Sequence, residues 1–227
     1  MNLNFIPVIT AVVPAVAVHV SYLLAAQMGH VPWCFPYIDS CTSISAVGRN
    51  SPESHVFRAA IIPTGVFMMI YWRLSYEWFK TLNTRMPIRN RSMLYCGIIA
   101  SIGVILYATV LGSIGPEYHL QRRLGVTTFY IFTFLAQLLL TLQIGGVAKR
   151  RPAPVSARVY RCLVAICAMV PILGLANMLS WALYRENGSI DHAIAWTVTL
   201  FILGYFFVTY FAWKQSGFQA RFTVTAS

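Results

Sequence analysis

Charged residues are scarce in this sequence. Only 10% of the 227 residues are Asp, Glu, Lys or Arg, and 58% are hydrophobic. Soluble domains average about 25% charged and about 45–50% apolar residues. The shortage of charge excludes an ordinary soluble domain and indicates a chain that lies in a bilayer.

Several motifs that carry chemistry are also missing. No HxxxH or HExxH spacing places two metal ligands on one helix face, so we predict no metal site. The sequence has no glycine-rich phosphate loop and no G-x-S-x-G turn, which argues against nucleotide-driven transport and an ordinary serine hydrolase. We therefore expect no cofactor.

Long apolar runs are what the chain has instead. A helix needs about 20 apolar residues to cross a hydrocarbon core about 30 Å thick. Six runs meet this length, at residues 5–27, 56–79, 93–113, 125–147, 159–184 and 193–213. The first run is too long for a signal peptide, and no Lys or Arg precedes it. The sequence predicts an all-α, integral membrane bundle of six helices in a single domain over residues 1–227, with an outer loop at 28–55.

Positive charge is unevenly distributed. The 17 Lys and Arg residues outnumber the six acids and concentrate in the connections at 80–92 and 148–158, with more in the C-terminal tail. The positive-inside rule places these segments and both termini in the cytoplasm. We expect the charge to contact lipid headgroups and not nucleic acid. The protein is then multi-pass in the cell membrane, or in an endomembrane of a eukaryotic cell.

Acids and histidines gather on the opposite, outer side. The outer acids are Asp39, Glu53, Glu117, Glu186 and Asp191, and the outer histidines are His30, His55, His119 and His192. Two interpretations stay open. The basic residues orient the chain and leave the others outside by default, or the outer groups converge on a lipid headgroup, a metal or acid–base chemistry.

Three polar features lie at or inside the predicted helices. His19, in the outer half of the first run, is either a functional residue, because an ionisable group in a bilayer is costly, or an interhelical hydrogen-bonding residue. Arg73 and Glu77 stand four residues apart, which predicts an ion pair, flanked by Trp72 and Trp78 as interfacial anchors.

The five cysteines divide by position. Cys96, Cys162 and Cys167 fall inside the apolar runs and are expected to be packed thiols. Cys34 and Cys41 fall in the outer loop. In an oxidising compartment they form a disulfide, and the alternative is two free thiols.

The segment "PYIDSCTSISAVGRNSPESHVF", residues 36–57, resembles the outer loop of the Frag/DRAM/Sfk family of six-helix membrane proteins. The matching positions are Pro36, Tyr37, Ile38, Asp39, Ser40, Pro52, Glu53 and Phe57, with "SISAVG" at 43–48 and His119 before the fourth helix. Two departures stand out. Asp39 and Ser40 occur in reversed order, and the Glu-Trp pair often found early in the family's sixth helix is Ala195 and Trp196 here.

The resemblance implies a role with membrane lipids, since family members are linked to lipid remodelling of GPI anchors, phospholipid asymmetry and autophagy. We expect the chain to bind a lipid and to modulate lipid remodelling or distribution without catalysis. In this hypothesis Arg58 pairs with a phosphate. Asp39, Glu53, His119 and His19 contact the rest of the headgroup.

Two alternatives remain. The first is a lipid hydrolase or acyltransferase, with His119 as general base, Asp39 or Glu117 as its orienting carboxylate, and Ser40 or Ser43 as nucleophile. The second is a scaffold that assembles with another membrane protein.

Overall fold

The computed structural model describes residues 3–82, 87–113, 115–149, 153–183 and 190–219. These residues form helices and connections, with no strand among them. The helices are α1 (Ile6–Gln27), α2 (Pro36–Asp39), α3 (Ile44–Val47), α4 (Glu53–Thr81), α5 (Pro87–Val110), α6 (Pro116–Ala148), α7 (Ala157–Leu183) and α8 (Asp191–Gln215). Glu186, one of the outer acids expected from the sequence, lies outside the described residues.

Six of these helices, α1 and α4 to α8, are long and apolar enough to cross a membrane. A helix satisfies its backbone hydrogen bonds within itself, which is why apolar runs of this length adopt it in a bilayer. The predicted all-α, multi-pass architecture is therefore confirmed. α6 begins before its apolar run, which starts at residue 125. Pro116, at its first turn, starts the helix within the preceding polar segment.

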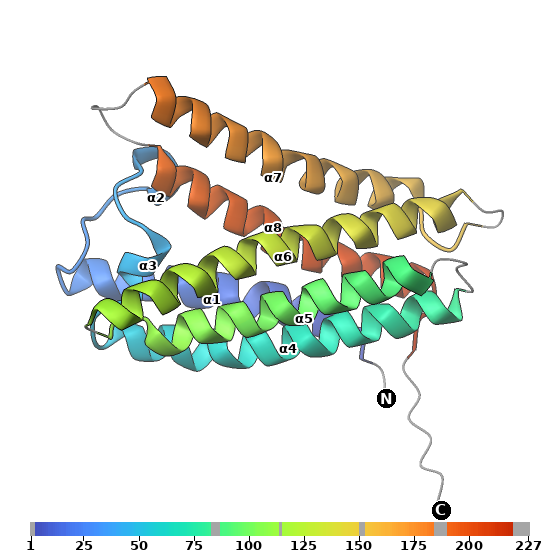
Figure 1. Ribbon diagram of the computed structural model, residues 1–227, viewed down its shortest axis with the longest axis horizontal. Helices are drawn as coiled ribbons and strands as arrows, with labels where there is room; N and C mark the ends of the chain where they lie inside the picture. Colours follow the sequence, from blue (N-terminus) through green and yellow to red (C-terminus); the bar gives the residue numbers. More distant parts are fainter. Residues whose placement is uncertain (1–2, 83–86, 114, 150–152, 184–189, 220–227) are drawn as a thin grey trace, which may run out of the picture.

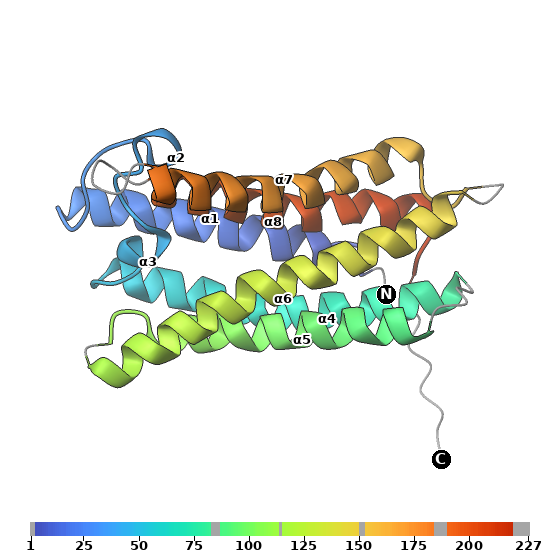
Figure 2. The ribbon, with the colours of Figure 1, turned by 45° about the horizontal axis from the view of Figure 1, so that its top comes forward.

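The six long helices run alternately up and down (Figure 1). α1 packs against α4 and α8, and α5 packs against α4 and α6. α7 contacts α6 and α8, and it diverges from α6 toward one end of the bundle (Figures 1 and 2). α1 begins and α8 ends at the opposite end (Figure 1).

The end toward which α6 and α7 diverge is covered by α2, α3 and their connections. We call residues 28–52 the cap, and this end of the bundle the capped end. The cap lies beside the last turns of α1 and the first turns of α8, as both views show (Figures 1 and 2). The predicted outer loop is therefore a folded segment with two short helices.

An aromatic cluster joins α4 to α8 toward the other end. The Tyr71 and Trp213 rings stack with centroids 5.5 Å apart, and Phe206 meets the Tyr71 ring edge-on at 4.9 Å. Trp72 and Trp78 are fully buried in this region. The expectation that these two tryptophans are interfacial anchors is therefore wrong, because both pack inside the protein. The predicted ion pair between Arg73 and Glu77 is present at 2.6 Å.

α5 and α6 cross in direct backbone contact. A Cβ atom on Gly103 of α5 would lie 2.9 Å from the carbonyl oxygen of Gly125 and 3.0 Å from the amide nitrogen of Phe129. Both neighbours are backbone atoms of α6, so neither can rotate away. The absence of a side chain at Gly103 sets the closeness of this crossing.

We expect Gly103→Ala to lower the melting temperature of the detergent-solubilised protein, because the added methyl group forces α5 and α6 apart at a cost of about 1–3 kcal/mol. Gly146→Ala is the matched control. A Cβ on Gly146 of α6 meets nothing within 4 Å, and alanine favours the helix by up to about 1 kcal/mol. Equal melting temperatures for the two variants would contradict this account of the crossing.

Candidate functional site: a capped cavity at one end of the bundle

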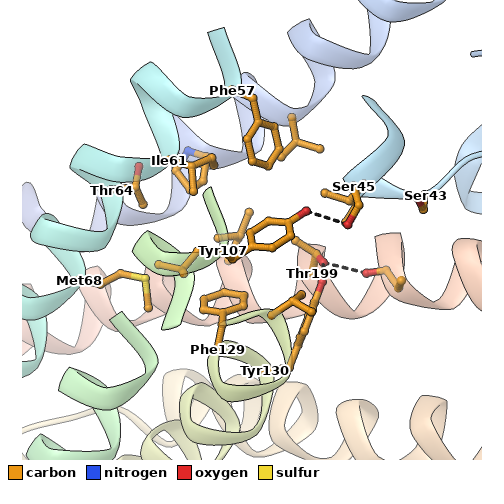
Figure 3. A pocket seen from close by; sticks show the side chains of 17 residues that line it. Ser43, Ser45, Phe57, Ile61, Thr64, Met68, Tyr107, Phe129, Tyr130 and Thr199 are labelled. Carbon is orange, nitrogen blue, oxygen red and sulfur yellow. Dashed lines mark hydrogen bonds between the residues drawn. The ribbon is translucent and has the colours of Figure 1, made fainter. Parts of the chain in front are cut away.

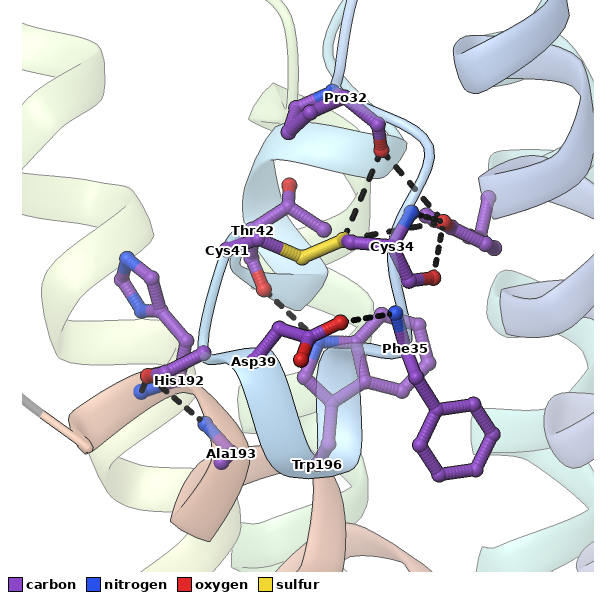
Figure 4. Close-up of a disulfide and its surroundings, with 11 residues drawn as sticks. Pro32, Cys34, Phe35, Asp39, Cys41, Thr42, His192, Ala193 and Trp196 are labelled. Atoms are coloured by element: carbon purple, nitrogen blue, oxygen red, sulfur yellow. Dashed lines mark hydrogen bonds between the residues drawn. A yellow bond between two sulfur atoms is a disulfide. The ribbon is translucent and has the colours of Figure 1, made fainter.

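A disulfide and one tyrosine hold the cap to α1. Cys34 and Cys41 are disulfide-bonded (Figure 4). The hydroxyl of Tyr22 on α1 accepts a hydrogen bond from the Cys34 amide at 2.9 Å and donates one to the Cys34 carbonyl at 2.6 Å. The first cysteine of the bridge is therefore fixed to the membrane bundle through its own backbone.

The cap is also tied to α8. The indole nitrogen of Trp196 donates to the carbonyl of Thr42 at 2.9 Å, and the Ser40 hydroxyl accepts from the amides of His192 and Ala193 at 3.1 and 3.2 Å (Figure 4). The first amides of a helix have no partner within the helix. Ile190, at the N-cap position of α8, has no polar side chain to supply one. Ser40 therefore caps α8 from a distant part of the sequence.

His19 lies between α1 and the cap. Its Nδ1 donates to the Ala15 carbonyl at 2.7 Å, since a carbonyl can only accept, and its Nε2 accepts from the Tyr37 hydroxyl at 2.9 Å. Burial raises the pKa of the Tyr37 phenol, which keeps it protonated as a donor. The Trp196 ring packs edge-on against both rings. His19 thus makes one hydrogen bond within α1 and one that joins α1 to α2.

Glu53 is an inward-facing carboxylate at the start of α4. Its side chain is fully buried, and its Oε1 accepts from Nδ1 of His30 at 2.7 Å. Its Oε2 is also buried and has no hydrogen-bond partner among the described residues. Glu53 therefore joins the cap to α4 and does not project toward the membrane surface.

Beneath the cap lies a cavity of about 150 Å³ between α1, α3, α4, α5, α6 and α8 (Figure 3). Most of its wall is apolar. The lining residues are Pro14, Val18, Ser43, Ile44, Ser45, Phe57, Ile61, Thr64, Met68, Val104, Tyr107, Val126, Phe129, Tyr130, Ala195, Thr199 and Leu203. None of these residues carries a carboxylate, an imidazole or a basic group, so its polar chemistry is that of hydroxyls.

Four of the six hydroxyls in the wall occur in two pairs, while those of Ser43 and Thr64 are hydrogen-bonded to the backbone of their own helices. The first joins Ser45 Oγ of α3 to the Tyr107 hydroxyl of α5 at 2.8 Å. The second joins the Tyr130 hydroxyl of α6 to Thr199 Oγ1 of α8 at 2.5 Å (Figure 3). Each pair bridges elements that lie far apart in the sequence, so the pairs hold the cavity wall together.

The residues predicted to bind a headgroup lie in separate contacts around the capped end. Nη2 of Arg58 donates to the Leu111 carbonyl, and its Nε is buried with no partner among the described residues. Asp39 Oδ2 accepts from the Phe35 amide at 2.6 Å. With His19 and Glu53 in the contacts given above, the structure does not bring this set into one pocket.

The residues of the alternative enzymatic site are likewise engaged elsewhere. Ser43 caps α3 by accepting from the Ala46 amide at 3.1 Å. Nδ1 of His119, on α6, is hydrogen-bonded to Arg122 at 2.7 Å. Among the described residues, no hydrogen bond joins His119 to Asp39, Glu117 or Ser43.

Sequence reasoning missed the paired hydroxyls, although one signal was present. Tyr130, Thr133, Gln137 and Thr141 recur at spacings of three and four residues, which places them on one face of α6. Thr133, Gln137 and Thr141 are buried, and Gln137 donates to the Ile202 carbonyl of α8 at 3.0 Å. A polar stripe within an apolar span indicates the face that meets other helices.

Comparison with known protein families identifies the family of this chain. The family model described as "Frag1/DRAM/Sfk1/Cwh43P N-terminal domain" matches residues 2–216. The chain belongs to this family. No curated protein and no solved structure matches it significantly. In this family member Ala195, which stands where the resemblance expects glutamate, lines the cavity, and Trp196 beside it binds the cap.

We expect His30→Ala to destabilise the solubilised protein by about 1–3 kcal/mol, because the buried Glu53 carboxylate loses the hydrogen bond to its Oε1. His30→Gln should restore part of the loss, since its amide can donate. His55→Ala, which removes an exposed histidine two residues beyond Glu53, is the control. Thermal unfolding measures all three, and a His30→Ala protein as stable as the control would show that the pair contributes nothing.

Proposed function

We propose that this protein binds a membrane lipid with an acyl chain in the capped cavity, and that it thereby modulates lipid remodelling or distribution. The observation that carries the proposal is the apolar cavity itself, which lies within a membrane-spanning bundle beneath a cap anchored to both α1 and α8.

The size and lining of the cavity favour hydrocarbon. Its 150 Å³ is roughly ten times the space that one water molecule requires by the same kind of measure. Phe57, Ile61, Thr64 and Met68 line it along one face of α4, a length of about 16 Å at the rise of an α-helix. A narrow apolar space of this length suits a chain and is a poor site for water or a polar solute.

The charge at the capped end supports a phosphate-bearing headgroup. The Arg49 backbone and the Arg58 guanidinium both lie against Gly112, just beyond the end of α5. Arg58 forms no ion pair with a carboxylate among the described residues, and His119 is hydrogen-bonded to Arg122. We place the headgroup near these arginines, since guanidinium groups bind phosphate well.

Binding is favoured over catalysis because the cavity wall offers no acid or base. Hydrolysis or transfer of an acyl chain needs an activated nucleophile, and the Ser43 hydroxyl at the cavity already accepts a backbone hydrogen bond. A lipid-binding member could act alone or present its lipid to a partner membrane enzyme.

The membrane orientation is part of the proposal. The uncapped end, where α1 begins and α8 ends, faces the cytoplasm, because basic residues at the adjoining ends of α4, α5 and α6, namely Lys80, Arg89 and Lys149, lie there. The capped end then faces the oxidising side, in agreement with the disulfide.

A bulky side chain in the cavity should exclude the acyl chain. The probe is a diacyl phospholipid that carries a diazirine in its acyl chain. In the wild-type protein we expect it to crosslink to cavity-lining peptides of α4, α6 and α8. Ile61→Trp should reduce this labelling by about tenfold or more. Ile70→Trp is the matched control, because Ile70 lies on the same helix and is 39% exposed. Crosslinks confined to exposed helix faces, unchanged by Ile61→Trp, would contradict the proposal.

The cellular role is tested by comparative lipidomics. Cells lacking the protein should show an altered lipid composition or leaflet distribution, which the wild-type gene corrects and the Ile61→Trp gene does not. An unchanged lipid profile together with a stoichiometric co-purifying membrane protein would favour the scaffold. Release of labelled fatty acid by the purified protein would favour the hydrolase.

A further inference from the structure

The Ser45–Tyr107 pair stands at the capped end of the cavity. Ser45 belongs to α3 in the cap, and Tyr107 lies three residues before the end of α5 at Val110. Both residues line the cavity (Figure 3). The two oxygens are 2.8 Å apart, and Tyr107 is only 5% exposed.

A count of hydrogens shows that this pair is not saturated. Each hydroxyl has one hydrogen to donate, so the pair has two and uses one of them between its own oxygens. Neither oxygen donates to any other described protein atom. One O–H hydrogen is therefore left without an acceptor among the described protein atoms.

The Tyr130–Thr199 pair differs in this respect. Thr199 Oγ1 donates to the Ala195 carbonyl at 2.7 Å, so it accepts from the Tyr130 hydroxyl in their 2.5 Å contact. Both hydrogens of this pair are used. Each pair thus combines a phenol with an aliphatic hydroxyl, and of the two only the Ser45–Tyr107 pair has a hydrogen that is not donated.

We propose that the cavity selects a lipid whose chain is joined through a carbonyl group, with the carbonyl oxygen accepting the spare hydrogen of the Ser45–Tyr107 pair. An ester and an amide both supply this acceptor, whereas an ether-linked alkyl chain has no carbonyl oxygen and offers only the linkage oxygen between two of its carbons. A buried donor that is left without an acceptor costs free energy, because it has lost its hydrogen bond to water and gained none in return. The inference rests on the proposed function, because it specifies how the bound chain is attached.

The position of the pair agrees with this assignment. The acyl carbonyls of a phospholipid lie at the border between the hydrocarbon core and the headgroup layer, and the pair lies where the α5 span ends under the cap. The apolar wall along α4 continues inward from it. The Arg58 guanidinium lies against Gly112, just beyond the end of α5. A single lipid can therefore place its chain, carbonyl and phosphate in order along the site.

The first experiment uses the wild-type protein in detergent. A diester phospholipid, its dialkyl ether analogue and an amide-linked analogue, matched in headgroup and chain length, compete with the diazirine lipid for labelling of the cavity. We expect the ester to compete about tenfold better than the ether. An amide that matches the ester identifies the carbonyl as the recognised group, and one that matches the ether would overturn the assignment to the carbonyl. Equal competition by ester and ether overturns the inference.

Two double variants assign the preference to the spare hydrogen. Ser45→Ala with Tyr107→Phe removes both donors, and the ester-to-ether ratio should fall from about ten to about one. Tyr130→Phe with Thr199→Val also removes one phenol and one aliphatic hydroxyl from the same cavity. Whatever its effect on overall affinity, this control should keep the wild-type ratio. A tenfold ratio that survives in the Ser45→Ala, Tyr107→Phe protein would overturn the assignment.

A spectroscopic measurement needs no variant. The infrared carbonyl band of a ¹³C-labelled diester lipid should shift to lower wavenumber when it binds the wild-type protein, as expected for a carbonyl that accepts a hydrogen bond, and an unshifted band overturns the inference. Failure of the proposed function is distinguishable. In that case neither ester nor ether competes and Ile61→Trp has no effect, whereas equal competition that Ile61→Trp abolishes removes only the carbonyl preference.

Discussion

Inside a bilayer, a polar group must find its partner within the protein or on a bound molecule, because lipid tails offer no hydrogen bonds. This constraint accounts for much of the described structure. Tyr22 is hydrogen-bonded to both the amide and the carbonyl of Cys34. Trp196 donates to the Thr42 carbonyl, and Ser40 accepts from the first amides of α8. Hydrogen bonds between polar groups therefore hold the cap on the bundle. By the same rule, the spare hydrogen of the Ser45–Tyr107 pair calls for an acceptor on a bound molecule.

The outer acids and histidines form one group in the sequence, but the structure places Glu53, Asp39 and His19 in separate hydrogen-bonded contacts. Glu53 is buried against His30, Asp39 accepts from the Phe35 amide, and His19 bridges α1 and α2. Their contacts organise the cap from within. Arg58 and Arg122, in contrast, form no ion pair with a carboxylate among the described residues.

Sequence reasoning predicted the six spans well, because the length and composition of an apolar run depend on the bilayer and hardly on the neighbouring helices. The choice of contacts between spans was less accessible. Trp72 and Trp78 resemble interfacial anchors in sequence, but their burial depends on the position of α8. Ser45 and Tyr107 are separated by 62 residues, and no local pattern relates them. A helical period identifies a polar face, whereas the partner of that face follows from the packing.

The attachment of the cap to α8 has a consequence for biosynthesis. The cap emerges from the ribosome early, yet the residues that donate hydrogen bonds to it, His192, Ala193 and Trp196, belong to α8. Ala195, Thr199 and Leu203 of the same helix form one wall of the cavity. In a nascent chain the cavity therefore lacks this wall, and the cap lacks these contacts, until α8 has been synthesised and inserted.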